Sequence, residues 1–401
     1  MEVSMYNKYD TYLFLLIATL VCGNFGGGFQ VSRMLSIALF PFLIDLLGKE
    51  TDTYLINIRK FCVFWTFYII VSLLWTSDFY NGLKECVYYI VQFIYFLEII
   101  EFSKEAFQAK KSISIGWIVG LLISLIIAIW EIKTDIHLSV SKFSEAIAMN
   151  MGETIFIHHF ASVTFFNYNG YVVYLCMCVP FLFYFFDKKN YYIILVISLV
   201  ACIYVLLTNA SRGGILAFSV FLCYFLVSSL KRGNISVIAI ISIFVVIAVF
   251  VVYSWDSLSV FFHARIANGF NDQSRWEIWG RSMQVFISSY GLGSGAGSIV
   301  ESLRRISSVG DILICHNAFL ELLIQYGVII FIPCMCFLFG IFKRARYVSD
   351  ISAKMIVFGS FLMMLPLFII DSGILLSTHL WAFIGSLFVF TEIDSRNIVV
   401  A

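Results

Sequence analysis

Long runs of apolar residues, separated by short polar segments, dominate the pattern of this 401-residue chain. A helix needs about 20 apolar residues to cross a hydrocarbon core of roughly 30 Å, and many runs reach that length. We therefore expect an all-α polytopic integral membrane protein. The pattern predicts twelve transmembrane helices, over residues 12–25, 31–47, 61–76, 83–100, 113–131, 168–186, 190–207, 213–230, 236–253, 318–341, 351–370 and 374–391.

Composition agrees with this pattern, because 61% of the residues are hydrophobic and only 13% are charged. The first apolar run leads into Cys22-Gly23-Asn24-Phe25 without a clear small-x-small cleavage site, so we expect the first helix to be retained. No internal repeat is evident, and the connection 187–190 is too short for the central linker of a two-halved transporter. A single transmembrane domain over residues 1–401 is the simplest interpretation.

Two longer polar segments interrupt the apolar pattern, a shorter loop at 132–167 and a long loop at 254–316. The long loop holds five arginines, a glycine-rich run and the sequence Cys-His-Asn at its end. Its apolar residues at 276, 279, 283, 286 and 287 have helical spacing, which predicts an amphipathic helix lying against the membrane face or the bundle.

Lysine and arginine are enriched in short cytoplasmic loops, so their distribution predicts the orientation of the helices. With the N-terminus inside, the short outer segments hold only Arg33, Lys84, Lys133, Lys142 and Arg212. The inner segments hold Lys8, Lys49, Arg59, Lys60, Lys104, Lys110, Lys111, Lys188, Lys189, Lys231, Arg232, Lys343, Arg344, Arg346, Lys354 and Arg396. Both termini are therefore expected in the cytoplasm, and both polar loops on the outer side.

The ten cysteines do not indicate a disulfide framework. All but Cys315 lie in or at the edges of predicted spans, where a thiol behaves as a small hydrophobe. The Cys176-x-Cys178 and Cys334-x-Cys336 pairs point to different helix faces, which argues against a shared metal site. Cys315 lies beside His316, as a reactive thiol would, but we interpret it as a bystander.

Four local patterns follow one another on the predicted outer face. They are Phe165-Phe166-Asn167-Tyr168-Asn169-Gly170, then Leu207-Thr208-Asn209-Ala210-Ser211-Arg212-Gly213-Gly214, then Arg275 with Trp279 before the Gly291–Gly297 run, and finally His316-Asn317-Ala318-Phe319-Leu320-Glu321 with Gly327. In this order they resemble the family of O-antigen polymerases and O-antigen ligases over roughly residues 160–330. Arg212-x-x-x-Leu216 resembles the family's Arg-x-x-x-Leu element. His316-Asn317 with Gly327 resembles its His-Asn element, although Ile330 stands where Gly, Thr or Tyr is usual.

This resemblance implies a GT-C-like glycosyltransferase of the bacterial inner membrane, with its active site on the periplasmic face. It implies an undecaprenyl-diphosphate-linked glycan donor and acceptor, surrounding membrane lipids, and a polysaccharide chain-length regulator as a candidate partner; nucleic acid is not expected. We favour an O-antigen polymerase, because neither loop is enlarged for a bulky lipid A core and the ligase-type element is altered at Ile330. An O-antigen ligase is the alternative. A lipid-linked oligosaccharide flippase is a second alternative, although it would spread charges along many helices.

The departing diphosphate gains charge as the glycosidic bond breaks, so the site needs fixed cations that bind phosphate oxygens bidentately. Arg212, at the outer mouth of the eighth span, is the first candidate. Ser211 and Gly213-Gly214 leave room beside it for a lipid diphosphate and expose backbone donors. The alternative for Arg212 is snorkelling of its side chain to the interface.

Arg275 is the second candidate cation, although it could instead form an ordinary ion pair with Asp272 or Glu277. Trp279, one turn on, suits either stacking on a sugar or a place at the lipid interface. Asn167 and Asn169 are further substrate-binding candidates that the resemblance implies. The alternating glycines of the Gly291–Gly297 run indicate a tight re-entrant turn, with an anion-binding nest as the alternative.

His316 opens the tenth predicted span, and its imidazole can take a proton from an acceptor hydroxyl. The alternative is a histidine that anchors the helix end at the interface. Asn317 lies at the cap position and is a substrate-binding candidate. Glu321 lies within the span, where a carboxylate is costly without a partner or a function, so it could orient His316 or bind a sugar. His158 and His159 are weaker candidates; neither a metal nor another cofactor is expected.

Overall fold

The structure is a computed structural model that describes residues 6–25, 27–49, 53–142, 147–151, 154–189, 192–230, 273–306, 314–369 and 373–392. In these ranges the chain is predominantly α-helical. The helices are α1 (Lys8–Ala18), α2 (Val31–Leu47), α3 (Thr53–Ser72), α4 (Phe79–Glu105), α5 (Ala109–Thr134), α6 (Tyr168–Lys189), α7 (Tyr192–Thr208), α8 (Arg212–Leu230), α11 (Gln273–Ser288), α12 (Ile299–Arg304), α13 (Ala318–Ala345), α14 (Ile351–Leu367) and α15 (Thr378–Phe390). Two short 3₁₀ helices, η1 (Thr19–Cys22) and η2 (Ile374–Leu376), complete them.

The described helices agree in position with the apolar runs. Each predicted span except 236–253 overlaps a described helix, and 236–253 lies outside the described residues. By length and composition, six of the described helices can cross a membrane: α3, α4, α5, α6, α8 and α13. Three shorter apolar helices, over 193–208, 351–367 and 378–390, stand beside them. The fold is therefore a polytopic α-helical membrane protein, and the count of twelve spans stays a prediction.

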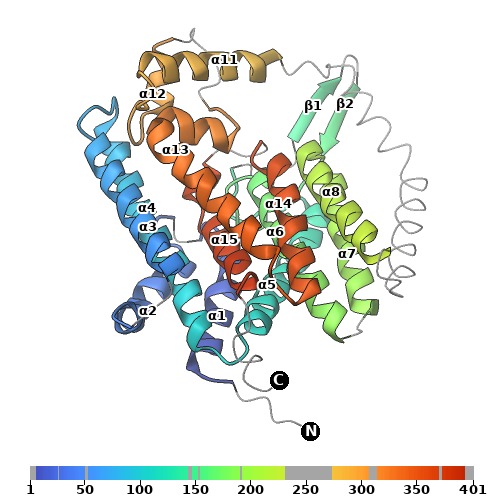
Figure 1. The fold of residues 1–401 in the computed structure, drawn as a ribbon. Coiled ribbons are helices and arrows are strands. Elements are labelled where there is room, and N and C mark those ends of the chain that lie inside the picture. The colour runs from blue at the N-terminus through green and yellow to red at the C-terminus, as the bar shows by residue number, and fades with distance from the viewer. Residues whose placement is uncertain are drawn as a thin grey trace.

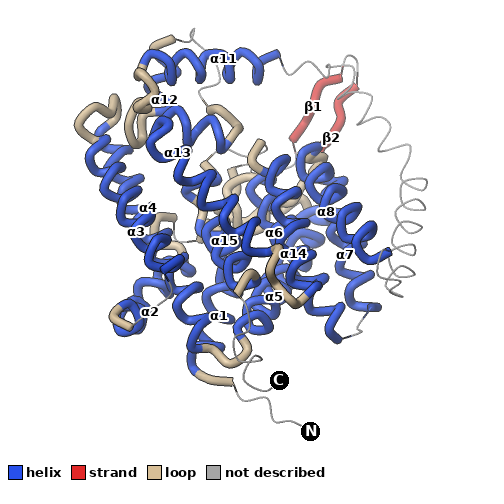
Figure 2. The backbone as a smooth tube through the Cα atoms, in the orientation of Figure 1, coloured by secondary structure: helices blue, strands red, loops and turns tan. Residues whose placement is uncertain are grey.

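One pair of strands adds to the all-α expectation. Strands β1 (Ile147–Met151) and β2 (Thr154–His158) pair antiparallel within the shorter polar loop, with Ile147 opposite His158. Figure 2 shows this hairpin at the same end of the bundle as α11 and α12. The apolar pattern assigns no secondary structure to the loop 132–167, and the hairpin's backbone hydrogen bonds structure part of it.

Helix α15 lies at the centre of the bundle (Figure 1), in contact with α4, α5, α13 and α14. Nearly all of its side chains are buried. Trp381 of α15 packs against Trp65, Phe93 and Tyr89, with ring centroids 4.9–6.4 Å apart. Such aromatic pairs contribute about 0.5–1.5 kcal/mol each beyond their buried area. This cluster joins α3, α4 and α15 beneath the end that carries the polar loops.

The other end of the bundle, where α1 begins and α15 ends, is held by polar contacts. Buried Asp10 completes a capping box with Asn7 and accepts hydrogen bonds from the N–H groups of Phe107 (3.0 Å) and Gln108 (2.7 Å). Ion pairs join Arg59 to Glu101 (2.6 Å) and Lys49 to Glu105 (2.7 Å). These basic residues belong to the set that the sequence assigns to the cytoplasmic side.

Candidate functional site

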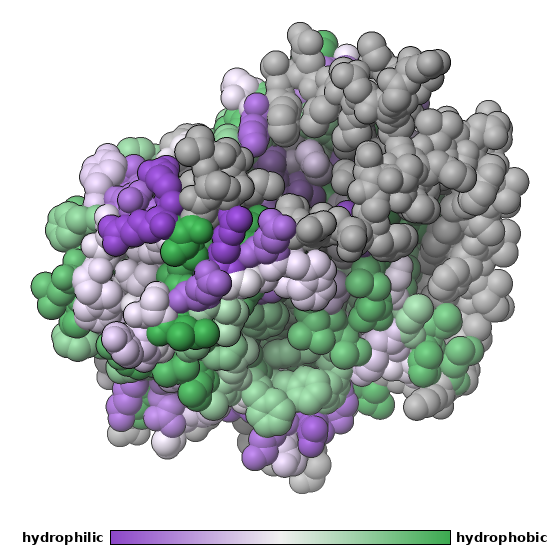
Figure 3. Space-filling view, turned by 90° about the horizontal axis from the view of Figure 1, so that it is seen from above, coloured by the Kyte–Doolittle hydropathy of each residue, from purple (hydrophilic) through white to green (hydrophobic). Residues whose placement is uncertain are grey.

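Two adjacent cavities open at the end of the bundle that carries α11 and the hairpin. Figure 3 looks down on this end, where hydrophilic residues gather beside hydrophobic ones on the described part of the face. The larger cavity, of about 450 Å³, contains Arg33 and is called the Arg33 cavity. The smaller, of about 330 Å³, contains Glu321 and is called the Glu321 cavity. Tyr88, Gly373 and Leu376 line both, so the cavities share a wall.

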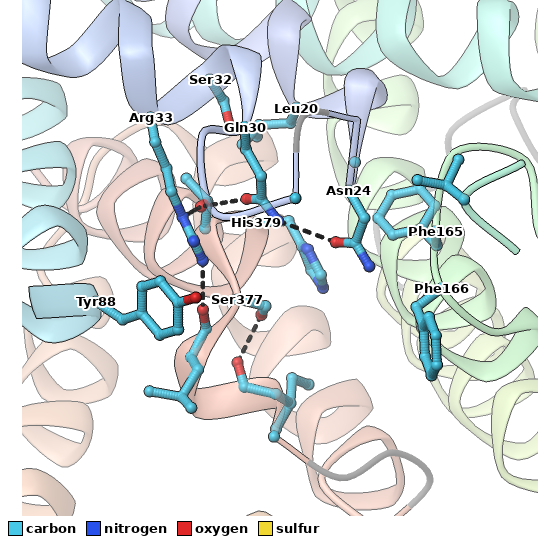
Figure 4. Close-up of a pocket in the computed structure, with 18 of the residues that line it drawn as sticks. Leu20, Asn24, Gln30, Ser32, Arg33, Tyr88, Phe165, Phe166, Ser377 and His379 are labelled. Atoms are coloured by element: carbon cyan, nitrogen blue, oxygen red, sulfur yellow. Dashed lines mark hydrogen bonds between the residues drawn. The ribbon is translucent and has the colours of Figure 1, made fainter. Parts of the chain in front are cut away.

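Arg33 lies in the first turn of α2 and is only 7% exposed. Its guanidinium donates to the carbonyl of Leu376 (3.0 Å), the hydroxyl of Thr378 (3.3 Å) and the carbonyl of Gly28 (3.5 Å). The group also lies over the ring of Tyr88, 4.6 Å from its centroid. Figure 4 shows this arrangement at the cavity wall. The cation is therefore fixed in place by uncharged partners.

The remaining polar wall of the Arg33 cavity comes from amides and an imidazole. Gln30 donates to Asn24 (2.9 Å) and accepts from the hydroxyl of Thr378 (3.3 Å). His379 packs edge-on against Phe165, with ring centroids 5.6 Å apart. Asn167, a predicted substrate-binding residue, lines this cavity and accepts a hydrogen bond from the N–H of Gly170 (2.7 Å).

The Glu321 cavity contains two carboxylates on facing helices. Glu321, in the first turn of α13, is 4% exposed and accepts from the N–H of Gly373 (3.0 Å). Glu85 of α4 accepts from Gln325 (2.8 Å), Tyr326 (2.8 Å) and the N–H of Gly297 (2.9 Å). A carboxylate among apolar helices needs such donors. Glu321 thus contacts Gly373, directly before η2, and forms part of the cavity wall.

Two contacts from α11 hold Cys315, the residue before His316, and we call this pair of contacts the clamp. The indole of Trp279 donates to the carbonyl of Cys315 (3.0 Å), and the hydroxyl of Ser282 lies 3.2 Å from the Cys315 sulfur. Next to this clamp, His316 has φ of 48°, and the side chain of Asn317 caps α13 by accepting from the N–H groups of Phe319 and Leu320. Trp279 and Asn317 therefore both position the backbone around His316.

Cys315 itself is inert. Its side chain is buried, and desolvation raises the pKa of the thiol to about 12. At neutral pH the group stays a thiol, and the thiolate is the nucleophilic form. The buried thiol supports the interpretation of Cys315 as a bystander of His316.

The face that α11 packs against the bundle is not its predicted apolar stripe, which was expected against either the membrane face or the bundle. Ile278, Ser282 and Val285 are buried against the rest of the protein, and α11 contacts α13. Trp276 (66% exposed) and Ile287 (67% exposed), which belong to the predicted apolar stripe, face outward. The outward position suits a helix that lies at a lipid interface.

The glycine run packs into a break in α13. Gly327 has non-helical dihedrals, φ 62° and ψ −166°, which release the carbonyls of Ile324 and Gln325 from the helix. The N–H groups of Ser294 (2.7 Å) and Gly295 (3.0 Å) donate to those carbonyls. A broken membrane helix requires such substitute partners. A Cβ at Gly293 would collide with the carbonyl of Gln325, which explains the small residue there.

The same contacts exclude the anion nest. Each N–H of residues 293–297 already has an acceptor. The N–H groups of Ser294 and Gly295 donate to carbonyls, and that of Gly297 donates to Glu85. Those of Ala296 and Gly293 donate to the hydroxyls of Ser72 (3.1 Å) and Ser289 (3.1 Å), respectively. The N–H of Ser298 likewise donates to the carbonyl of Gly295 (3.4 Å), so it is not free to bind an anion. The run is a packing element that joins α13 to α3 and α4.

The motifs at 167–170 and 208–214 meet in space. Ser211 donates to Asn169 (3.5 Å), and Asn209 holds the preceding loop through both polar atoms of Ala161, at 2.7 and 2.9 Å. Arg212 is exposed at the first position of α8. Arg275 lies in the first turn of α11, and its side chain is outside the described residues.

The weaker candidate His159 and the loop residue Arg304 have ordinary surface contacts. Exposed His159 pairs with Asp135 (2.7 Å), and the exposed Arg304 pairs with Glu301 (2.9 Å). The side chain of His158 is outside the described residues. Within the described ranges, no group of three or more His, Cys, Asp or Glu residues is arranged to hold a metal ion.

The sequence interpretation missed the residues that shape the cavities. Arg33 was counted only as an outer basic residue, although it falls inside the predicted span 31–47, where an arginine is costly. Glu85 and Glu131 are likewise charged residues inside predicted spans, 83–100 and 113–131. Glu131 is fully buried and accepts from the N–H groups of Ser162 and Val163, both at 2.8 Å. It thereby anchors the loop that leads to Asn167.

The apolar helices and the two cavities together define a multi-pass membrane protein with polar cavities at one end. Residues 193–335 match the family model described as O-antigen ligase. The chain is also similar to the teichuronic acid biosynthesis protein TuaE of Bacillus subtilis (strain 168), with 26% identity over 294 residues. That alignment covers 68% of this chain and 57% of the relative's length. The resemblance to the O-antigen ligase and polymerase family is thus confirmed.

Proposed function

We propose that the protein is a glycosyltransferase that polymerises undecaprenyl-diphosphate-linked oligosaccharide units into O-antigen or a related surface polysaccharide. The observation that carries the proposal is that parts of the family-like motifs line two adjacent cavities at one end of the bundle: Asn167 lines the Arg33 cavity, and Glu321 lines the Glu321 cavity. The Bacillus subtilis relative is named for teichuronic acid biosynthesis. A surface polysaccharide other than O-antigen is therefore included.

In the proposed reaction, an acceptor hydroxyl attacks the anomeric carbon of the donor and the bond to the diphosphate breaks. His316 takes the hydroxyl proton as general base. Arg212 and Arg275 hold the diphosphate, whose negative charge grows in the transition state. Glu321 orients the acceptor or His316. Polyprenyl diphosphate leaves, and no metal is required because the arginines neutralise its charge.

Substrate contacts are proposed for the side chains that the motifs bring to this end. Ser211 and Asn169 lie together beside Arg212, and Asn167 lines the Arg33 cavity. Asn317 uses its carbonyl oxygen for the helix cap, so its amide N–H groups would contact substrate. The indole N–H of Trp279 donates to Cys315 and its ring contacts Trp276, so a sugar would stack on the rest of the ring surface. A chain-length regulator is the proposed protein partner.

The proposed topology has twelve spans in the bacterial inner membrane, both termini in the cytoplasm, and the loops 132–167 and 254–316 in the periplasm. We expect a membrane-impermeant thiol reagent to label Tyr290→Cys and Tyr80→Cys from outside, in a Cys-depleted background, and to spare Tyr347→Cys. All three side chains are strongly exposed, so accessibility depends on the side of the membrane. Permeabilised cells should label Tyr347→Cys as well. The reverse pattern would contradict the topology and the periplasmic reaction.

A reconstitution assay tests the activity. Purified protein supplied with undecaprenyl-diphosphate-linked repeat units alone should form a ladder of longer lipid-linked products, and EDTA should leave the rate unchanged. Ligation to lipid A core is the second candidate activity, favoured by the family model that residues 193–335 match. Product only after addition of lipid A core would establish the ligase instead. Loss of activity in EDTA with rescue by a divalent ion would refute metal independence.

A further inference from the structure

The Arg33 cavity has a charge pattern that the proposed reaction does not use. Its described lining contains one arginine, no lysine and no acidic side chain. The buried guanidinium of Arg33 is held by two carbonyls, the hydroxyl of Thr378 and the side chain of Tyr88, and no carboxylate of the described residues lies within 4 Å of it. A buried cation among neutral groups favours the binding of an anion.

The rest of the wall suits a sugar. Asn24, Gln30 and Asn167 supply amides, and the rings of Phe165 and Phe166 lie on the other side of the cavity (Figure 4). Sites for small ligands combine apolar walls with a few convergent polar groups in roughly 300–1,000 Å³. The volume here, about 450 Å³, falls in that range.

We propose that the Arg33 cavity binds a sugar unit that carries a single carboxylate, with Arg33 holding the carboxylate. The proposal rests on the proposed function, because the sugar would belong to the glycan that the protein extends. One guanidinium matches one carboxylate, whereas a diphosphate carries more negative charge than this wall can neutralise. The site lies next to the Glu321 cavity, with Tyr88 in the shared wall, so the bound unit would be adjacent to Glu321, one of the residues of the proposed reaction.

The test compares methyl β-glucuronide with methyl β-glucoside, which differ by the charge of one substituent. Their binding to the full-length protein in nanodiscs is measured by competition in saturation-transfer NMR. Wild type should prefer the acidic glycoside by about tenfold or more, the usual contribution of a hydrogen bond to a charged group. Arg33→Gln should abolish the preference while the neutral glycoside still binds. Equal binding of the two glycosides to wild type would overturn the proposal.

A second variant covers the case in which Arg33→Gln disturbs folding, since Arg33 also holds the loop at Leu376. Gln30 reaches the same Thr378 hydroxyl as Arg33, so Gln30→Glu places a carboxylate beside the guanidinium with almost no change in shape. It should remove the acid preference. Arg304→Gln, an exposed arginine outside the cavity, is the control and should retain it. An acid preference that survives Gln30→Glu would also overturn the proposal.

Inorganic pyrophosphate distinguishes the carrier diphosphate from the sugar as the source of the anion. Pyrophosphate should compete no better than inorganic sulfate for the Arg33 cavity; strong, Arg33-dependent competition would assign the cavity to the carrier and overturn the sugar proposal. Failure here is separable from failure of the proposed function. Glycosyl transfer without any acid preference would refute only the cavity assignment, and acid preference without transfer would refute only the activity.

Discussion

Replacing His316 with asparagine is expected to lower the rate of glycosyl transfer by about 10²–10⁴, the usual contribution of a general base. The backbone of His316 has φ of 48°, a left-handed conformation that asparagine tolerates better than most residues. Asparagine therefore removes the imidazole without the strain that alanine would add. The rate is measured at saturating donor, with purified protein and undecaprenyl-diphosphate-linked repeat units.

Donor affinity should stay near normal in His316→Asn, because the proposed diphosphate contacts come from arginines. His159→Asn is the matched control: this histidine lies at the same end, exposed and paired with Asp135, and its loss should leave the rate unchanged. Full turnover in His316→Asn would reduce His316 to an anchor of the helix end. The role of base would then pass to Glu321, whose carboxylate lines the neighbouring cavity.

Helix positions could be predicted from the sequence because a membrane span must satisfy its backbone within one continuous apolar segment. That requirement is local. The predicted span 31–47 has the bounds of α2, and the helix cap at Asn317 follows from the residue type. The face that α11 buries was not predictable in the same way. Both of its apolar sides have helical spacing, and only the contact with α13 decides between them.

The cavities depend on contacts between distant parts of the chain, which leave no local signal. Arg33 meets Leu376 and Thr378, more than 300 residues further along the sequence. The glycine run indicated a tight turn, but its partner is the break at Gly327 in another helix. A stricter use of the cost of charge in a span would have singled out Arg33 and Glu85, since both lie within predicted membrane helices.

Arg212→Lys is expected to lower turnover by about 10²-fold or more, the loss seen when one preorganised donor to a developing negative charge is removed. Lysine keeps the charge but lacks the planar fork that binds two phosphate oxygens at once. Ser211, next to Arg212 in the chain, is hydrogen-bonded to Asn169 and is unchanged in this variant. Donor affinity should weaken together with turnover, in contrast to His316→Asn.

The control for this substitution is Arg304→Lys, an exposed arginine at the same end that pairs with Glu301 and has no proposed contact with substrate. It should keep both donor affinity and turnover. Amounts of inserted protein and thermal unfolding are compared for all variants, because Arg212 also begins α8. If Arg212→Lys matches wild type in donor affinity and turnover, the side chain only snorkels to the interface, and Arg275 is left as the proposed ligand of the diphosphate. If affinity falls while Arg304→Lys is unaffected, the guanidinium geometry of Arg212 is what the donor requires.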